Sequence, residues 1–146
     1  MNISMEFSQK FASAYALACK PLCRELSISQ TALDILLFLA NNPDYQTATD
    51  IVEIRHIKPS LVSINVDRLV SDGLLRRESV ASDRRKTRLV LTDASQTIVA
   101  RGRAVQENFF ERLFDGMSRK QREAFDGALG QMTQNLDAML EGGAAK

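Results

Sequence analysis

The sequence predicts a mainly α-helical (α+β) chain that carries one short two-stranded β-hairpin. Three observations support this class: apolar residues recur at helical spacing through most of the chain, capping residues precede several of these stretches, and one segment near residue 80 alternates instead. With 146 residues, 45% of them hydrophobic, the chain can bury a substantial core. We therefore expect a single domain over residues 1–146.

The expected helices begin and end at recognisable local signals. Pro21 lies inside the first helix and should kink it or break it. Ser29 is a suitable N-cap for the second helix, and Thr47 with Asp50 resembles a capping box before the short third helix. Pro59 suits the first position of the fourth, and Ser118 with Gln121 resembles a capping box before the last. The expected ranges are 5–26, 29–41, 48–54, 59–72, 93–116 and 118–141.

A β-hairpin is expected between the fourth and fifth helices. Gly73 supplies a left-handed cap that ends the fourth helix. Strands are expected at residues 74–79 and 87–91, with a loop over residues 80–86. Thr92 is expected to cap the long helix that follows. The last residues, 142–146, are expected to form a loose tail.

This order of elements predicts a winged helix-turn-helix lobe, residues 29–93, flanked by N- and C-terminal helices. The second helix of the pair is short and amphipathic, with Val62, Val66 and Leu69 as its expected buried stripe. Its outer face can therefore enter a DNA major groove about 12 Å wide. Residues 55–88 hold nine Lys or Arg and four acids, a net charge of +5 in a chain whose total is +1. Such segregation is typical of a face that binds polyanions, although basic runs also occur on plain solvated surface.

The expected hairpin would form the wing of this lobe. Its cations are expected to contact DNA together with the helix that begins at Pro59. An acid would be repelled by phosphates, so Asp83 is expected to support the wing by holding Arg85 through charge-assisted hydrogen bonds. Thr47 and Ser60 are interpreted as helix caps whose neighbouring backbone N–H groups could also meet a phosphate. The expected DNA-binding residues are Thr47, Lys58, Pro59, Ser60, Ser63, Ile64, Arg84, Arg85 and Lys86.

The outward positions of the fourth helix contain no Arg, Asn or Gln, the residues that make bidentate contacts with bases. We therefore expect base reading to depend on Ser60, Ser63 and an apolar contact from Ile64 to a thymine methyl group. Phosphate contacts and DNA shape would supply most of the affinity.

Residues 66–93, VDRLVSDGLLRRESVASDRRKTRLVLTD, resemble the recognition-helix end, wing and strand of the MarR (multiple antibiotic resistance regulator) family of transcription factors. The most specific parts are the D-x-R of Asp83 to Arg85 and the L-T of Leu91-Thr92. One departure is Ser95, which stands where the family commonly has glycine. The resemblance covers essentially the whole chain.

The resemblance implies an obligate homodimer, built from helices within residues 1–28 and 94–141, that binds pseudo-palindromic double-stranded DNA. It also implies a transcriptional regulator, expected to be a repressor, under the control of an unknown small-molecule effector or an oxidant. A short heptad seam in the last helix fits dimerisation, with apolar residues at positions 125, 129, 132, 136 and 139.

Several residues have two interpretations. Cys19 and Cys23 could sense an oxidant if Lys20 and Arg24 lower a thiol pKa, or they could pack as small hydrophobic residues. His56 fits either a polar turn or a phosphate contact. Two apolar columns in the long helix fit either an effector cavity or plain core packing. They contain Ile98, Val105, Phe109 and Leu113 in one and Phe110, Phe114 and Met117 in the other.

Other classes of function find little support in the sequence. We expect no enzyme, cofactor or metal site, because no H-E-x-x-H, phosphate-binding glycine loop or nucleophile elbow is present. No apolar run reaches the roughly 20 residues of a membrane span, no secretion signal opens the sequence, and two cysteines suit the cytoplasm. The alternative to DNA binding is a winged-helix interaction module with an acidic protein partner, which would lack steeply salt-dependent binding to duplex DNA.

Overall fold

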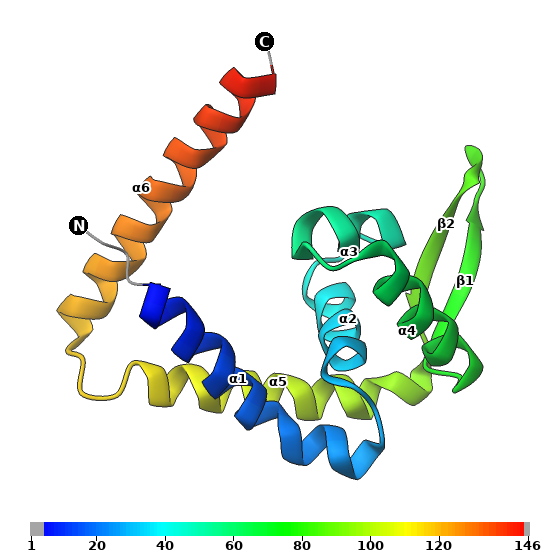
Figure 1. The fold of residues 1–146 in the computed structure, drawn as a ribbon, viewed down its shortest axis with the longest axis horizontal. Coiled ribbons are helices and arrows are strands. Elements are labelled where there is room, and N and C mark those ends of the chain that lie inside the picture. Colours follow the sequence, from blue (N-terminus) through cyan, green and yellow to red (C-terminus); the bar gives the residue numbers. More distant parts are fainter. Residues whose placement is uncertain (1–4, 145–146) are drawn as a thin grey trace. The chain divides into compact units, whose positions relative to one another are not determined.

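The structure is a computed structural model that describes residues 5–144, apart from the side chains of Arg84, Arg85 and Ala144. The contacts divide the chain into two compact units, residues 1–109 and residues 110–146, and the single domain expected from the sequence stays a prediction. The elements are α1 (Met5–Leu26), α2 (Gln30–Asn41), α3 (Ala48–Arg55), α4 (Pro59–Ser71), β1 (Leu75–Val80), β2 (Asp83–Leu91), the 3₁₀ turn η1 (Asp93–Ser95), α5 (Gln96–Leu113) and α6 (Arg119–Ala144) (Figure 1).

Helix α2 is the centre of the first unit. It is buried on more than one side, as expected for a helix whose apolar residues run all the way round it. Ile35 and Leu36 pack into a cluster with residues of α3, α4 and the hairpin, while Leu33 and Leu37 pack into a second cluster with residues of α1. The apolar run at residues 35–40 therefore forms a core that two sets of elements share.

Cys19 and Cys23 belong to the cluster between α1 and α2. Cys19 is only 1% exposed and Cys23 is half-buried against the same side chains. Burial raises the pKa of both thiols, and the nearby Asp34 carboxylate raises both further. This direction is opposite to the one that an oxidant sensor requires, so the structure supports the packing interpretation.

The α1 helix runs without a break from Met5 to Leu26 and contains Pro21. The expected break before the proline is therefore absent.

Tyr15, one turn before Cys19, accepts a hydrogen bond from Gln106 Nε2 at 3.2 Å, and burial raises the pKa of its phenol to about 12. The ring of Phe109 packs edge-on against Phe11 and Tyr15, with centroids 5.2 and 5.3 Å apart. Phe109 is thus a core residue.

The long helix begins and ends differently from the sequence expectation. Thr92 was expected to cap it, but its side chain makes no cap hydrogen bond and instead donates to the Gly73 carbonyl at 2.6 Å, which closes the base of the hairpin. A 3₁₀ turn, Asp93–Ser95, precedes α5, and both the Ser95 N–H (3.1 Å) and the Ser95 hydroxyl (2.7 Å) donate to the Thr92 carbonyl. The helix then ends at Leu113 instead of Gly116, which has the left-handed φ of +81°.

The second unit is dominated by α6. The expected capping box is confirmed, because the Gln121 N–H donates to Ser118 Oγ at 3.2 Å and the Ser118 N–H donates to Gln121 Oε1 at 2.9 Å. The Phe125 ring meets the Phe114 ring edge-on at 5.6 Å. Residues 142–144, expected to begin a loose tail, continue the helix, and residues 145–146 lie outside the described part.

A substitution at Gly102 in α5 tests the close approach of α5 to α2. A Cβ atom at this position would lie 2.8 Å from Leu37 Cδ2, in a buried cluster with little space to yield. We expect Gly102→Ala to lower the free energy of unfolding by about 1–2 kcal/mol, because overpacking outweighs the better helix propensity of alanine. Chemical denaturation followed by circular dichroism measures this.

Gly127→Ala in α6 is the matched control, since nothing lies within 4 Å of its built Cβ. It should raise the free energy of unfolding by about 0.5–1 kcal/mol. Equal stabilisation by the two substitutions would contradict the described packing of Leu37.

The raised thiol pKa values predict slow chemistry at neutral pH. We expect Cys19 and Cys23 of the folded protein to react with an aromatic disulfide reagent at least about tenfold more slowly than glutathione, because little thiolate is present and access is limited. Cys23, the more exposed, should react first. Single Cys→Ser variants assign the two rates, and a denaturant should restore both to the rate of a free thiol. A native thiol that reacts faster than glutathione would revive the sensor interpretation.

Candidate nucleic-acid interface

The outer face of α4 is exposed over the first half of the helix. Val62, Val66 and Leu69 are buried, which confirms the expected inner stripe. The four residues expected to face bases, Pro59, Ser60, Ser63 and Ile64, are all exposed. The structure therefore places these residues on one available surface, and their contacts with DNA remain a prediction.

A buried asparagine, which the sequence pattern did not single out, fixes the orientation of α4 relative to α2. Asn65 is buried on the inner side of α4, where its Nδ2 donates to the Leu61 carbonyl at 2.8 Å. Its Oδ1 accepts from Ser29 Oγ at 2.8 Å, and the same hydroxyl oxygen accepts from the Ala32 N–H as the N-cap of α2. One side chain thus joins the start of α2 to the middle of α4. A polar residue next to the apolar stripe was the available signal.

The two caps predicted by the sequence have different outcomes. Thr47 forms the expected capping box at the start of α3, with the Asp50 N–H donating to Thr47 Oγ1 at 3.1 Å. The Asp50 carboxylate accepts from the Gln46 and Thr47 N–H groups at 3.0 Å each, so these two N–H groups are already used within the chain. The cap predicted for Ser60 is wrong. Lys58 is the N-cap residue of α4, it makes no side-chain cap, and Ser60 lies inside the helix.

The wing is longer than the sequence predicts. Its strands pair in antiparallel register from Leu75↔Leu91 to Ser79↔Thr87 and then Val80↔Asp83, which leaves only residues 81–82 as the turn. The expected loop over residues 80–86 is therefore wrong, since Arg84, Arg85 and Lys86 belong to β2. These three residues lie between the partners of Ser79 and Val80, in a bulge near the tip.

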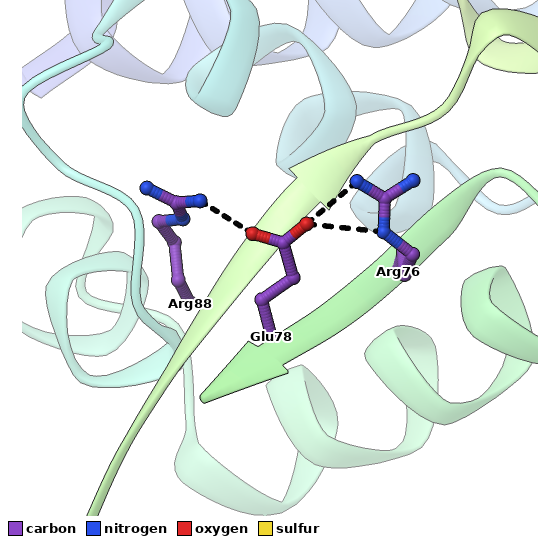
Figure 2. A network of polar contacts seen from close by, with 3 residues as sticks. All are labelled: Arg76, Glu78 and Arg88. Atoms are coloured by element: carbon purple, nitrogen blue, oxygen red, sulfur yellow. Dashed lines mark hydrogen bonds and ion pairs between the residues drawn. The ribbon is translucent and has the colours of Figure 1, made fainter. Parts of the chain in front are cut away.

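Glu78 organises the exposed face of the wing (Figure 2). Its Oε1 accepts from Arg76 Nε at 3.2 Å and from Arg76 Nη2 at 2.6 Å, while its Oε2 accepts from Arg88 Nη2 across the strand pair. These hydrogen bonds from the two guanidinium groups hold the pKa of the Glu78 carboxyl below its ordinary value. Arg76 and Arg88 are therefore held in place on the surface of the hairpin.

Two further bonds attach the wing to the helices of the lobe. Arg77 on β1 donates to the Asp67 carboxylate on α4. On β2, the Leu89 N–H donates to the Gln46 carbonyl, just before α3, at 2.8 Å. A mostly apolar groove lies between these two bonds and is lined by residues that include Val62 and Thr87. The wing and α4 thus form one surface.

The described cations of residues 55–88 fall into two groups. Five arginines have acidic partners: Arg76 and Arg88 with Glu78, Arg77 with Asp67, Arg55 with Asp34, and Arg68 with Asp72. Lys58 and Lys86 are exposed and are the cations without an ion pair among the side chains described here. The side chains of Arg84 and Arg85 lie outside the described residues, and so does the expected support of Arg85 by Asp83.

His56 terminates α3 in the left-handed conformation, with φ 52° and ψ 41°, and its side chain is exposed. This supports the interpretation as a polar turn residue. Nowhere in the described part do His, Cys, Asp and Glu gather as a group of three that could hold a metal ion. None of the helices described has both the length and the apolar character to cross a membrane.

Comparison with known proteins finds one matching family model and many similar solved structures. The model of the MarR family matches residues 25–86, which include α2 to α4 and most of the wing. The transcriptional regulator PA3341 has a similar crystal structure at 25% identity, with a TM-score of 0.77 over 90% of this chain and 96% of that one.

Several of the similar structures contain DNA. A MarR family transcriptional regulator from Listeria monocytogenes, complexed with 26mer DNA, has a TM-score of 0.80 at 16% identity over 93% of this chain and 90% of that one. The S. aureus MepR–DNA complex has a TM-score of 0.74 at 19% identity over 92% and 96%. At these identities the likeness concerns the fold. The matched family model covers residues 25–86 and the likeness of fold covers nearly the whole chain, so this chain is similar to the DNA-binding transcriptional regulators of the MarR family.

Proposed function

We propose that this chain is a cytoplasmic, homodimeric repressor that binds a pseudo-palindromic operator and is released by a small-molecule signal. The observation that carries the proposal is the exposed outer face of α4, with Lys58 at its start and Lys86 on the adjoining wing. Neither lysine has an ion pair among the described side chains. An effector is a better fit than an oxidant, because burial raises the pKa of both thiols.

The proposed mode of binding follows from this surface. Helix α4 lies in the major groove with Ser60, Ser63 and Ile64 toward the base edges. Lys58 meets a phosphate beside the groove, and Lys86 with Arg84 and Arg85 reaches the flanking backbone or minor groove from the wing. Thr47 contributes through the position of α3, because its hydroxyl is already used as a cap.

Dimerisation is proposed through the apolar seam of α6. Phe125, Leu129, Met132, Leu136 and Met139 repeat at spacings of four and three and are all exposed in the described chain. An exposed apolar row of this kind fits burial against a second copy. A two-fold dimer would place its two recognition helices in successive major grooves, about 34 Å apart.

Selection of bound duplexes from a random pool should recover a two-fold-symmetric site. On that site, we expect Lys58→Ala, Lys86→Ala and Arg85→Ala each to weaken binding about three- to tenfold at 0.15 M salt. Each should also reduce the slope of log affinity against log salt by about 0.9, the value for one lost phosphate contact. Ser63→Ala should change base preference without changing the slope. Fluorescence anisotropy over a series of salt concentrations measures both quantities.

Lys120→Ala, a change of the same charge on the exposed surface of α6, is the control and should alter neither quantity. If Arg85→Ala and Lys86→Ala left affinity and slope unchanged, the assignment of the wing to DNA would be wrong. Absence of duplex binding at low salt would favour an acidic protein partner instead.

The dimer seam makes a second prediction. Leu136 is 56% exposed in the single chain, so Leu136→Asp should not disturb the folding of the unit, but it would bury a charge in the proposed dimer. We expect sedimentation velocity to show a monomer, with at least about tenfold weaker binding to the two-fold site. Gln134→Asp adds the same charge to the opposite, exposed side of α6 and should remain dimeric. A wild-type chain that sediments as a monomer would refute the proposal.

A further inference from the structure

The outer face of α4 presents two large apolar side chains. Ile64 is 65% exposed and Leu61, one turn earlier, is 42% exposed, whereas Val62 between them is buried. Neither belongs to the hydrophobic clusters of the unit. Single exposed apolar residues are common on proteins. Their place matters here because the N-terminal half of a recognition helix is the part that meets base edges.

The longer polar side chains of α4 are already engaged. Asn65 is buried and uses its amide within the lobe, with Nδ2 bonded to the Leu61 carbonyl and Oδ1 to Ser29. The Asp67 carboxylate holds Arg77. Arg68 lies toward the end of the helix, where its Nε is 4.0 Å from Asp72 Oδ2. Among the described residues, the outer face therefore offers the bases short hydroxyls and apolar groups.

These groups differ in how well they distinguish bases. Serine hydroxyls donate or accept, so Ser60 and Ser63 can satisfy any base and select weakly among them. An apolar side chain selects more narrowly, because in the major groove only thymine presents a C5 methyl group. The charge of the surface also fits DNA, since Lys58 precedes α4 and Lys86 lies on the adjoining wing. Neither has an ion pair among the side chains that the structure describes.

We propose that the chain reads its operator mainly through thymine methyl groups, with Ile64 as the principal contact and Leu61 as a second. This inference rests on the proposed function and specifies the ligand of the same surface. The DNA recognised is then a half-site in which thymines at fixed positions are required for their methyl groups as much as for their pairing.

The test removes the methyl group alone. In the selected duplex, each thymine of a half-site is replaced in turn by deoxyuridine, which pairs identically but lacks the C5 methyl. Wild-type protein should bind about fourfold more weakly at each contacted position, the change expected for one buried methyl group. Replacing the T·A pair there by 5-methylcytosine·G should give tighter binding than cytosine·G.

Variants of the helix assign the contact. Ile64→Ala should weaken binding to the thymine duplex and make it insensitive to deoxyuridine, while Ile64→Val should keep the sensitivity. Ile54→Ala removes an isoleucine that is 42% exposed on α3 and should leave the deoxyuridine effect intact. Equal wild-type affinity for thymine and deoxyuridine duplexes would overturn the inference, even if salt-dependent binding shows that the proposed function stands. Loss of all duplex binding would instead remove the proposed function.

Discussion

The way α4 is held against the lobe is the constraint on which the rest of the candidate interface depends. Three kinds of interaction hold it: the buried stripe of Val62, Val66 and Leu69, the hydrogen bonds of Asn65, and the ion pair from Asp67 to the wing. The first two act on the inner side of the helix and the third on its exposed side, so rotating it by one residue, about 100°, would break all three together. The identity of the outer residues is therefore fixed by the packing of the inner ones. Because Asn65 is buried, removal of its partner Ser29 would leave a polar group unsatisfied, which makes this register more specific than apolar packing alone.

The cations of residues 55–88 do not all contribute equally to the positive charge that the surface can offer to a phosphate. Net charge counts every cation equally, but a guanidinium that already holds a carboxylate exposes little unbalanced charge to a phosphate. The Arg76–Glu78–Arg88 network crosses the two strands and orders the face of the hairpin (Figure 2). Exposed ion pairs of this kind contribute little to stability, so their main effect is to hold side chains in position. Among the described side chains of this segment, the available positive charge is then at Lys58 and Lys86.

Local sequence rules were sufficient for elements whose determinants lie within a few residues. The capping boxes at Thr47 and Ser118 and the inner stripe of α4 were predicted and are confirmed. The failures involve partners that are distant in the chain. Ser29 and Asn65 are 36 residues apart, and the Thr92 hydroxyl bonds to Gly73 instead of capping a helix. The extent of the wing depends on cross-strand register, which alternation in one strand does not determine. For the cysteines the sequence left sensing and packing both open, because it does not show that burial by distant residues outweighs the cations that are next to them in sequence.

A face of hydroxyl and apolar groups has consequences for how such a regulator would work. Each methyl contact contributes far less than a bidentate contact from arginine or asparagine, so one lobe alone can gain only modest preference for its half-site. Discrimination must then come from two lobes that bind one symmetric site together, where the second contact benefits from the effective concentration set by the first. Affinity in such a system depends steeply on the match between lobe spacing and half-site spacing. A ligand that favours a different spacing can therefore release the operator without touching α4 or the wing, provided that it binds the two arrangements with different affinity.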